Sequence, residues 1–140
     1  MTSYVVLDAG FVFKSLIPNP QRTQILQMLL QWKQERRVFC APSLWLYELT
    51  SILTKMTHFD ELTEQDAQDS LAAGLDLGVE LIVPGAGQTK KAFLWTRRLK
   101  RVAAYDSFYL ALAESLGCDL WTVDKKLVNA AGQTWVKLVA

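Results

Sequence analysis

Short apolar runs rich in β-branched and aromatic residues alternate along this chain with longer segments of helical periodicity. The runs that we predict to be strands are residues 4–7, 38–41, 79–83, 120–123 and 135–139. Four of them are mostly continuous apolar runs, which is typical of strands buried on both faces of a parallel sheet. The segments that we predict to be helices are residues 21–36, 43–56, 63–77, 89–101 and 105–116, with a short helix after Asp124. This order predicts an α/β sandwich with a mostly parallel sheet.

Three local signals support the predicted helix ends. Ser43 follows Pro42 and is an N-cap residue type. The sequence from Thr63 to Asp66 resembles a capping box with Asp in place of Glu or Gln. Gly117 follows the last apolar turn of its segment and is the usual C-cap residue.

The size and charge of the chain narrow the classes of protein it can belong to. We expect residues 1–140 to form a single domain, because 140 residues can bury one real core. The formal net charge of +1 argues neither for nor against a nucleic-acid partner, so any polyanion binding requires a local basic patch. No secretory leader or membrane-spanning run is visible, and a soluble, cytoplasmic protein without membrane contact is the expectation.

Cysteine and histidine offer little for chemistry. Cys40 and Cys118 lie far apart without a metal-binding or disulfide pattern, and we interpret them as small buried apolar residues. His58 is the single histidine of the chain, which leaves a histidine-based nucleophile relay or metal site with too few residues. We expect it to be a polar residue at a helix end.

Four acidic residues stand where apolar segments end or break, namely Asp8, Glu48, Asp106 and Asp124. Carboxylates rarely lie against apolar surface unless something pairs with them. If the four converge they repel one another, and a hard divalent cation such as Mg²⁺ or Mn²⁺ relieves that repulsion. The leading hypothesis is therefore a metal-dependent phosphodiesterase.

Asp8 and Asp124 each close a predicted strand. In an open parallel sheet ligands bind beyond the carboxyl ends of the strands, near the place where the strand order reverses. The alternative interpretation is that each carboxylate only caps the helix that follows. Thr122 points the same way as Asp124 by strand alternation, so a hydroxyl and a carboxylate can share one pocket.

Glu48 and Asp106 lie on predicted helices. Glu48 is at the margin of an apolar stripe, from which a long side chain can also reach water. Asp106 shares a helical face with Leu110, Ala113 and Gly117, although a carboxylate in a first turn also favours the helix dipole. Capping needs no apolar face, and this favours a functional interpretation of Asp106.

A basic stretch precedes Asp106, and two lysines follow Asp124. The residues are Lys90, Lys91, Arg97, Arg98, Lys100 and Arg101, with Lys125 and Lys126. Such a run is often only a solvated helix face. Beside an acidic metal site, we expect these side chains to guide RNA phosphates.

Taken together, these segments resemble the PIN domain family, most closely the small VapC-type ribonuclease toxins. The resemblance rests on residues 5–9 (VVLDA), 47–49 (YEL), 105–113 with Gly117 (YDSFYLALA), and 120–127 (LWTVDKKL). The last two segments are the specific ones.

The resemblance implies a three-layer α/β/α sandwich with a five-stranded parallel sheet. It also implies a Mg²⁺ or Mn²⁺ site formed by Asp8, Glu48, Asp106 and Asp124, with Thr122 nearby. The implied activity is an endoribonuclease that leaves a 5′-phosphate and a 3′-hydroxyl. A homodimer and a protein antitoxin are the implied partners, with residues 21–36 or 63–77 offering apolar positions for the dimer.

One departure from the family supports a different class of function. The family often has Ser, Thr or Asn two residues after the first aspartate, where this chain has Gly10. A contact that supports the metal ligands is then missing, which favours a catalytically silent PIN-like module that binds RNA or a protein partner. Aspartyl-phosphate enzymes and receiver domains also cluster acids at strand ends, but their paired acids are not evident here.

Overall fold

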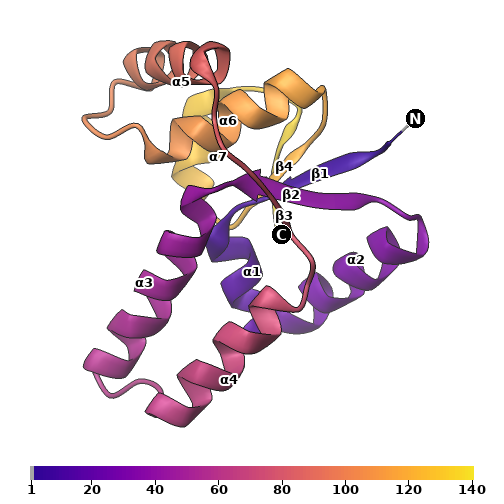
Figure 1. Cartoon of the computed structure of the whole chain (residues 1–140), viewed down its shortest axis with the longest axis vertical. Coiled ribbons are helices and arrows are strands. Elements are labelled where there is room, and N and C mark those ends of the chain that lie inside the picture. Colours follow the sequence, from indigo (N-terminus) through magenta and orange to yellow (C-terminus); the bar gives the residue numbers. More distant parts are fainter. Residues whose placement is uncertain (1) are drawn as a thin grey trace.

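Five parallel strands form one sheet at the centre of the molecule, in a computed structural model that describes residues 2–140 (Figure 1). The strands are β1 (Tyr4–Leu7), β2 (Val38–Pro42), β3 (Glu80–Ile82), β4 (Leu120–Thr122) and β5 (Val136–Leu138). Their spatial order is β3-β2-β1-β4-β5, and every neighbouring pair is parallel. All five strands were predicted from their apolar runs.

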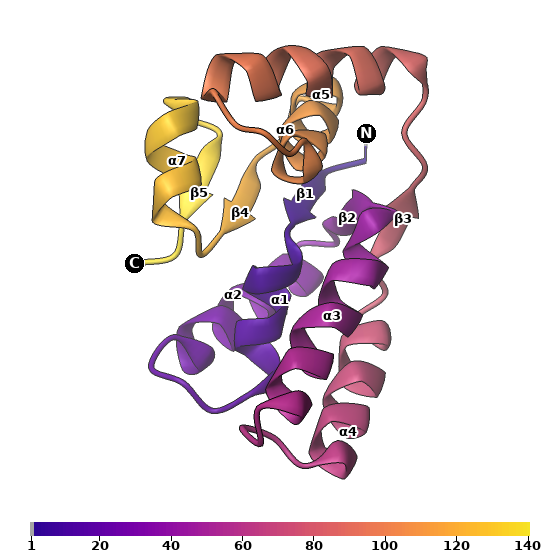
Figure 2. The ribbon, with the colours of Figure 1, turned by 90° about the vertical axis from the view of Figure 1, so that its left-hand side faces the viewer.

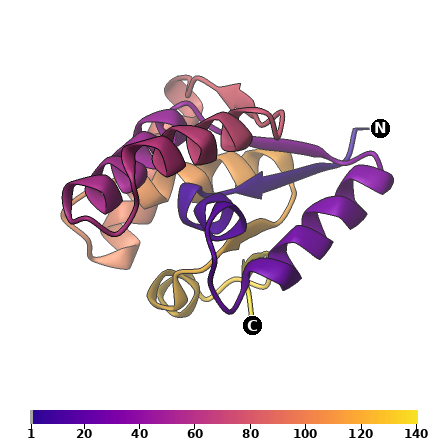
Figure 3. The ribbon, with the colours of Figure 1, turned by 90° about the horizontal axis from the view of Figure 1, so that it is seen from below.

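Helices cover both faces of this sheet. They are α1 (Ala9–Leu16), α2 (Arg22–Gln34), α3 (Leu44–His58), α4 (Glu64–Leu75), α5 (Ala86–Leu99), α6 (Tyr105–Leu116) and α7 (Lys125–Ala131). Helices α1 to α4 lie on one side, whereas α5 and α6 lie on the other (Figure 2). Seen from below, α1 lies between α2 and α3 and contacts both (Figure 3). The predicted three-layer α/β/α sandwich is confirmed.

Helix α1 is the element that the sequence patterns did not predict. Its residues include Phe11, Val12 and Phe13, which favour strands and show no clear amphipathic period. All three are buried, because α1 packs against α2, α3 and α4. The ring of Phe11 lies 6.0 Å from that of Trp32 and 6.5 Å from that of Trp121, measured between centroids. Tertiary packing thus overrides local propensity in this segment.

The predicted helix caps are confirmed at two of three positions. The Thr63 hydroxyl accepts a hydrogen bond from the Asp66 amide at 3.0 Å, and Gly117 adopts the left-handed conformation at φ 63°. The predicted cap by Ser43 is wrong. Its backbone is already helical (φ −56°, ψ −24°), so its side chain makes no capping bond, and its amide instead donates to the Ile82 carbonyl at 2.9 Å.

Cysteine and histidine play no visible chemical role in the fold. Cys40 and Cys118 are free thiols; Cys40 is fully buried, and burial raises its pKa to about 12, whereas Cys118 is only partly buried. His58 ends α3, is exposed, and packs edge-on against the ring of Phe59. Within residues 2–140 no helix is both long enough and apolar enough to cross a membrane.

Candidate functional site

The sheet has a switch point between β1 and β4. The chain runs from β1 outward to β2 and β3, and then returns to place β4 on the other side of β1. Connections leaving these two neighbouring strands therefore diverge and open a crevice at their carboxyl ends. Asp8 follows β1 directly, and Asp124 lies two residues beyond the end of β4. The position predicted for the acidic site is thus the crevice of this sheet.

Asp8 is held at the start of α1 by its own capping bond. Its Oδ1 accepts a hydrogen bond from the Phe11 amide at 2.8 Å. Burial raises the pKa of Asp8 to about 7, although hydrogen bonds from the Thr122 hydroxyl and the Phe11 amide oppose the rise. The charges of Asp106 and Glu48 raise this pKa further. Asp8 therefore both caps a helix and lies within the electrostatic reach of two other predicted site residues.

Glu48 reaches the site from α3 and is held there by α6. The Tyr109 hydroxyl donates a hydrogen bond to Glu48 Oε1 at 2.6 Å, and Tyr109 itself is only 1% exposed. Burial raises the pKa of Glu48, the bond from Tyr109 lowers it, and the charge of Asp106 raises it. Glu48 consequently faces inward instead of extending to water from the margin of α3.

Asp106 lies in the first turn of α6 and forms an ion pair. Arg101 Nη1 donates to Asp106 Oδ2 at 2.5 Å. Burial raises the pKa of Asp106, the Arg101 guanidinium opposes this, and the charge of Asp124 raises the pKa again. Arg101, which we predicted to contact RNA, is therefore also the cation that neutralises Asp106 in this structure.

Asp124 is the most exposed of the four acids. Its Oδ1 caps α7 by accepting a hydrogen bond from the Leu127 amide at 3.1 Å. Its own amide donates to the Thr122 hydroxyl at 3.0 Å, and Thr122 is fully buried. Thr122 thereby supports two of the acids, because its hydroxyl also bonds with Asp8.

The four carboxylates interact electrostatically, but their side chains are not arranged as a complete set of metal ligands within residues 2–140. No three Asp, Glu, His or Cys side chains among residues 2–140 lie close enough together to hold a metal ion. One oxygen of each carboxylate already accepts a bond from a protein donor, namely the Phe11 amide, the Tyr109 hydroxyl, the Arg101 guanidinium or the Leu127 amide.

The chemistry of this donor set nevertheless fits a hard divalent cation. In the part of the chain that the structure describes, the hydrogen bonds of Glu48, Asp106 and Asp124 use one carboxylate oxygen each. The second oxygen of each remains for a cation, and carboxylate oxygen is the preferred ligand of Mg²⁺ and Mn²⁺. Burial, and after it the neighbouring carboxylates, raise the pKa values of Asp8, Glu48 and Asp106, and a cation bound between them would lower those pKa values again.

The predicted basic residues divide into a near and a far group. Lys100 and Arg101 line a cavity of about 490 Å³ together with Glu48 and Asp106, and Lys125 and Lys126 follow Asp124 directly in the first turn of α7.

The other four basic residues lie on α5. Lys91 pairs with Glu114, which lies two turns along α6 from Asp106, about 12 Å by helical rise. Arg98 stacks on the Trp95 ring at 4.4 Å, and Lys90 and Arg97 are exposed. The structure therefore brings Lys100, Arg101, Lys125 and Lys126 to the acids, and keeps Lys91 away from them.

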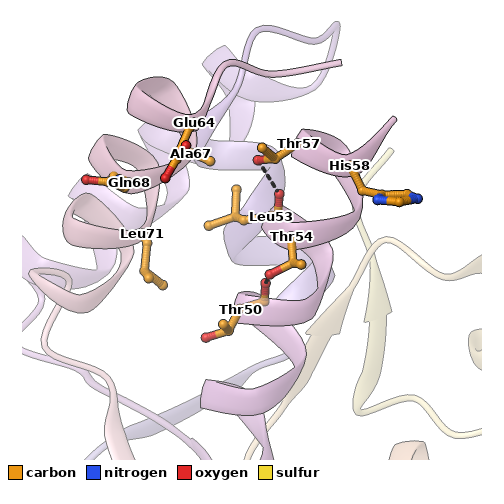
Figure 4. Close-up of a pocket in the computed structure, with 9 residues that line it drawn as sticks. All are labelled: Thr50, Leu53, Thr54, Thr57, His58, Glu64, Ala67, Gln68 and Leu71. Carbon is orange, nitrogen blue, oxygen red and sulfur yellow. Dashed lines mark hydrogen bonds between the residues drawn. The ribbon is translucent and has the colours of Figure 1, made fainter. Parts of the chain in front are cut away.

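A further cavity of about 390 Å³ lies between α3 and α4 (Figure 4). Its walls carry Leu53 and Leu71, and the threonine hydroxyls of α3 that line it bond to carbonyls of their own helix. His58 points away from it (Figure 4). Because it contains none of the four predicted acids, this cavity is separate from the candidate site.

Tyr109 is a site residue to which the sequence analysis gave no role. It lies three residues after Asp106 and so shares a helical face with that carboxylate. That spacing was the available signal, but the pairing with Glu48, which is 61 residues distant, depends on the packing of α6 against α3.

Comparison with known proteins agrees with this fold. The sequence model described as PIN domain matches residues 6–138. No curated protein matches the chain. Several solved structures are similar in fold. PAE2754 from Pyrobaculum aerophilum has a TM-score of 0.74 at 16% identity, covering 99% of this chain and 92% of its own.

Two further solved structures have a similar fold. VapC20 from Mycobacterium tuberculosis, a sarcin-ricin loop cleaving toxin, has a TM-score of 0.69 at 14% identity, covering 97% of this chain and 99% of its own. VapBC2 from Rickettsia felis was solved bound to a DNA fragment from its promoter. It has a TM-score of 0.70 at 16% identity, covering 91% of this chain and 92% of its own. At such identities the likeness concerns the fold alone. The family match, in contrast, spans nearly the whole sequence, and this chain belongs to the PIN domain family.

Proposed function

We propose that this chain is a Mg²⁺- or Mn²⁺-dependent endoribonuclease that acts on cytoplasmic RNA. One observation carries the proposal: Asp8, Glu48, Asp106 and Asp124 come from four different elements at the switch point of the sheet, and their charges raise the pKa values of three of them, namely Asp8, Glu48 and Asp106. PIN domains are generally nucleases and typically use divalent metals, which supports the same function.

In the proposed mechanism Asp8, Asp106 and Asp124 hold the cation. Thr122 supports this set, because its hydroxyl bonds with Asp8 and accepts from the Asp124 amide. A bound divalent cation lowers the pKa of water and shields the negative charge that develops on the phosphate oxygens. The buried α6 face behind Asp106 keeps bulk water away from one side of the site.

Glu48 is the proposed general base. A carboxylate with a raised pKa accepts a proton from the attacking water more readily than an ordinary surface carboxylate. Tyr109 fixes one oxygen of Glu48 and so leaves the other directed at the water. The water oxygen attacks phosphorus, the bond from phosphorus to the 3′ oxygen breaks, and that oxygen takes up a proton. The products are a 5′-phosphate and a 3′-hydroxyl.

Lys100, Lys125 and Lys126 are the proposed contacts to RNA phosphates. They lie beside the acids and carry the charge that a polyanion requires near an otherwise acidic site. Arg101 would join them if a bound cation took its place beside Asp106. Lys90, Lys91, Arg97 and Arg98 on α5 extend this surface for longer RNA.

The direct test is cleavage of single-stranded RNA by the purified protein. We expect Mg²⁺- or Mn²⁺-dependent products with 5′-phosphate ends, and loss of cleavage in Asp8→Asn and Asp106→Asn. Cleavage that persists in both variants, or in excess chelator, would contradict the assignment of the site. A mixture of RNA sequences is the right substrate, because a narrow preference can hide activity on one oligonucleotide.

A role as the toxin of a toxin–antitoxin pair is a finer proposal. The fold likeness to VapC20, a sarcin-ricin loop cleaving toxin, and to VapBC2 supports a ribonuclease toxin with a protein antitoxin. Induced expression should then arrest the growth of a bacterial host, and Asp8→Asn should not. Arrest by both proteins alike would argue against a toxin that acts through this site.

A catalytically silent PIN-like module that binds RNA or a protein partner is the second candidate. Gly10 and the absence of a closed ligand cluster within residues 2–140 favour it. A Cβ at position 10 would lie 3.7 Å from Asp8 Oδ1 and 3.4 Å from Val123 Cγ2, so a serine fits and its hydroxyl can reach Asp8. If the missing hydroxyl is what silences the site, Gly10→Ser should restore Mn²⁺ binding and cleavage to an inactive wild type.

A further inference from the structure

Two exposed tyrosines line one cavity beside the acidic site. Tyr47 on α3 is 72% exposed, and Tyr105, the first residue of α6, is 66% exposed. Together with Leu44, Ile52 and Lys55 they line a cavity of about 450 Å³, which is within the usual size range of small-ligand sites. Large aromatic rings exposed at the mouth of a cavity are available to a ligand.

This cavity adjoins the one above the acids. Glu48 and Tyr105 line both cavities, and the second also carries Lys100, Arg101 and Asp106. A chain molecule that places a phosphate at the acids therefore passes directly into the space beside the two tyrosines. Lys55 lies in the first cavity and Lys100 in the second, so a cation is present on either side of the shared residues.

These features match the chemistry of an unpaired nucleotide. Single-stranded nucleic acids bind where aromatic side chains offer a stacking face and basic side chains contact the backbone. Bases inside a duplex cannot present their faces in this way, so only an unpaired base can enter. The mixed lining, with apolar Leu44 and Ile52 beside two tyrosines, suits a flat ring with polar edges.

We propose that the cavity between α3 and the start of α6 binds an unpaired base of single-stranded RNA next to the scissile phosphate, with Tyr47 and Tyr105 as stacking platforms. The inference rests on the proposed function, since it takes the phosphate at the acids as its starting point. It adds a binding site for one base of that RNA, formed by two aromatic side chains of this chain.

The test compares two fluorescent probes by anisotropy, with Ca²⁺ in place of Mg²⁺. One probe is a short single-stranded RNA of mixed sequence, and the other is the same chain with abasic sites at its centre. Both carry the same backbone charge, so their difference in affinity measures contacts to bases. The wild type should bind the intact RNA about tenfold more tightly than the abasic one.

Variants assign this preference to the tyrosines. Tyr47→Ala and Tyr105→Ala should each lose most of it while leaving the affinity for the abasic probe unchanged, and Tyr47→Phe should retain it. Phe59→Ala is the matched control, because Phe59 is an equally exposed aromatic (67%) at the far end of α3 that lines neither cavity. Thermal unfolding of the alanine variants checks that these surface changes leave the fold intact.

The outcomes separate this inference from the proposed function. A wild type without base preference, or a preference that survives in the variant with both alanines, overturns the inference, even if metal-dependent cleavage persists and still requires Asp8. Binding of neither probe together with no cleavage overturns the proposed function and the inference together. If the alanine changes instead dissociate a dimer and leave base preference intact, the cavity is a self-association surface and the inference fails.

Discussion

The substitution Asp8→Asn removes one buried charge and preserves the geometry around it. Asn is as good an N-cap as Asp, and its side-chain oxygen can accept the same bond from the Phe11 amide. The variant therefore isolates the effect of the charge on the metal-free protein. Burial and the nearby carboxylates place the folded-state pKa of Asp8 at about 7, against an ordinary value of 3.8.

That shift predicts both the sign and the size of a pH effect. The folded protein binds the proton of Asp8 more tightly than the unfolded chain does, so stability falls as pH rises from about 4 to about 7. Above that range the full penalty applies, and it amounts to about 4 kcal/mol at 1.36 kcal/mol per pH unit. Glu48 and Asp106 act in the same direction, because their pKa values are also raised.

The assay is urea unfolding of both proteins in excess chelator across this pH range. Several of the five tryptophans are buried, so their fluorescence reports unfolding. The free energy of unfolding of Asp8→Asn should exceed that of the wild type by a margin that grows by about 3 kcal/mol between about pH 5 and about pH 8. The slope of the free energy of unfolding against urea concentration should be the same for the variant and the wild type.

A control with the same chemistry is Asp124→Asn. Asp124 also caps a helix through Oδ1 but is exposed, so this variant measures what replacing an Asp cap by Asn does by itself to the free energy of unfolding. Two results would contradict this account: a difference in the free energy of unfolding between the two proteins that does not change with pH, or a variant that is less stable than the wild type at high pH. Either would mean that the charge of Asp8 does not destabilise the metal-free protein.

Three further changes test other parts of the site. Tyr109→Phe removes the hydrogen-bond donor to Glu48. It should lower the free energy of unfolding by about 1 kcal/mol and raise the pKa of Glu48 further. An unchanged pH profile of cleavage would contradict this role of Tyr109. Arg101→Gln removes the ion pair with Asp106, and calorimetry should then show Mn²⁺ binding that is about two- to fivefold tighter. Weaker binding would show that Arg101 and the cation do not compete for Asp106. Leu30→Glu places a charge on an apolar position of α2 that is 59% exposed. Light scattering should show a dimer for the wild type and a monomer for this variant. A wild-type monomer at micromolar concentration would contradict the proposed dimer.

The sequence contained enough to predict Asp8 and Asp124 at one edge of the sheet, but not the hydrogen-bond partners of the acids on the helices. Asp8 and Asp124 follow apolar runs, and the carboxyl ends of parallel strands lie at one edge of the sheet, so their proximity follows from local patterns. The pairing of Glu48 with Tyr109 joins α3 to α6, and no local pattern specifies it. The same reason explains why the cavity between Tyr47 and Tyr105 was not predicted.

Local sequence propensity predicts the wrong conformation in two segments where tertiary packing determines it. Residues 9–16 contain β-prone Phe11, Val12 and Phe13 but form a helix, because Asp8 caps it and the surrounding elements bury all three of these side chains. The cap expected at Ser43 failed because the chain is already helical there, and the Ser43 amide bonds to β3 instead. Both segments were correctly placed between strands even though their local details were not.

The central claim is that Asp8 belongs to a divalent cation site, and a Mn²⁺ titration by calorimetry tests it most directly. The wild type should show saturable binding that is lost in Asp8→Asn, while the variant remains folded. Absence of binding to the wild type, or equal binding by both proteins, would contradict the claim and favour the catalytically silent module.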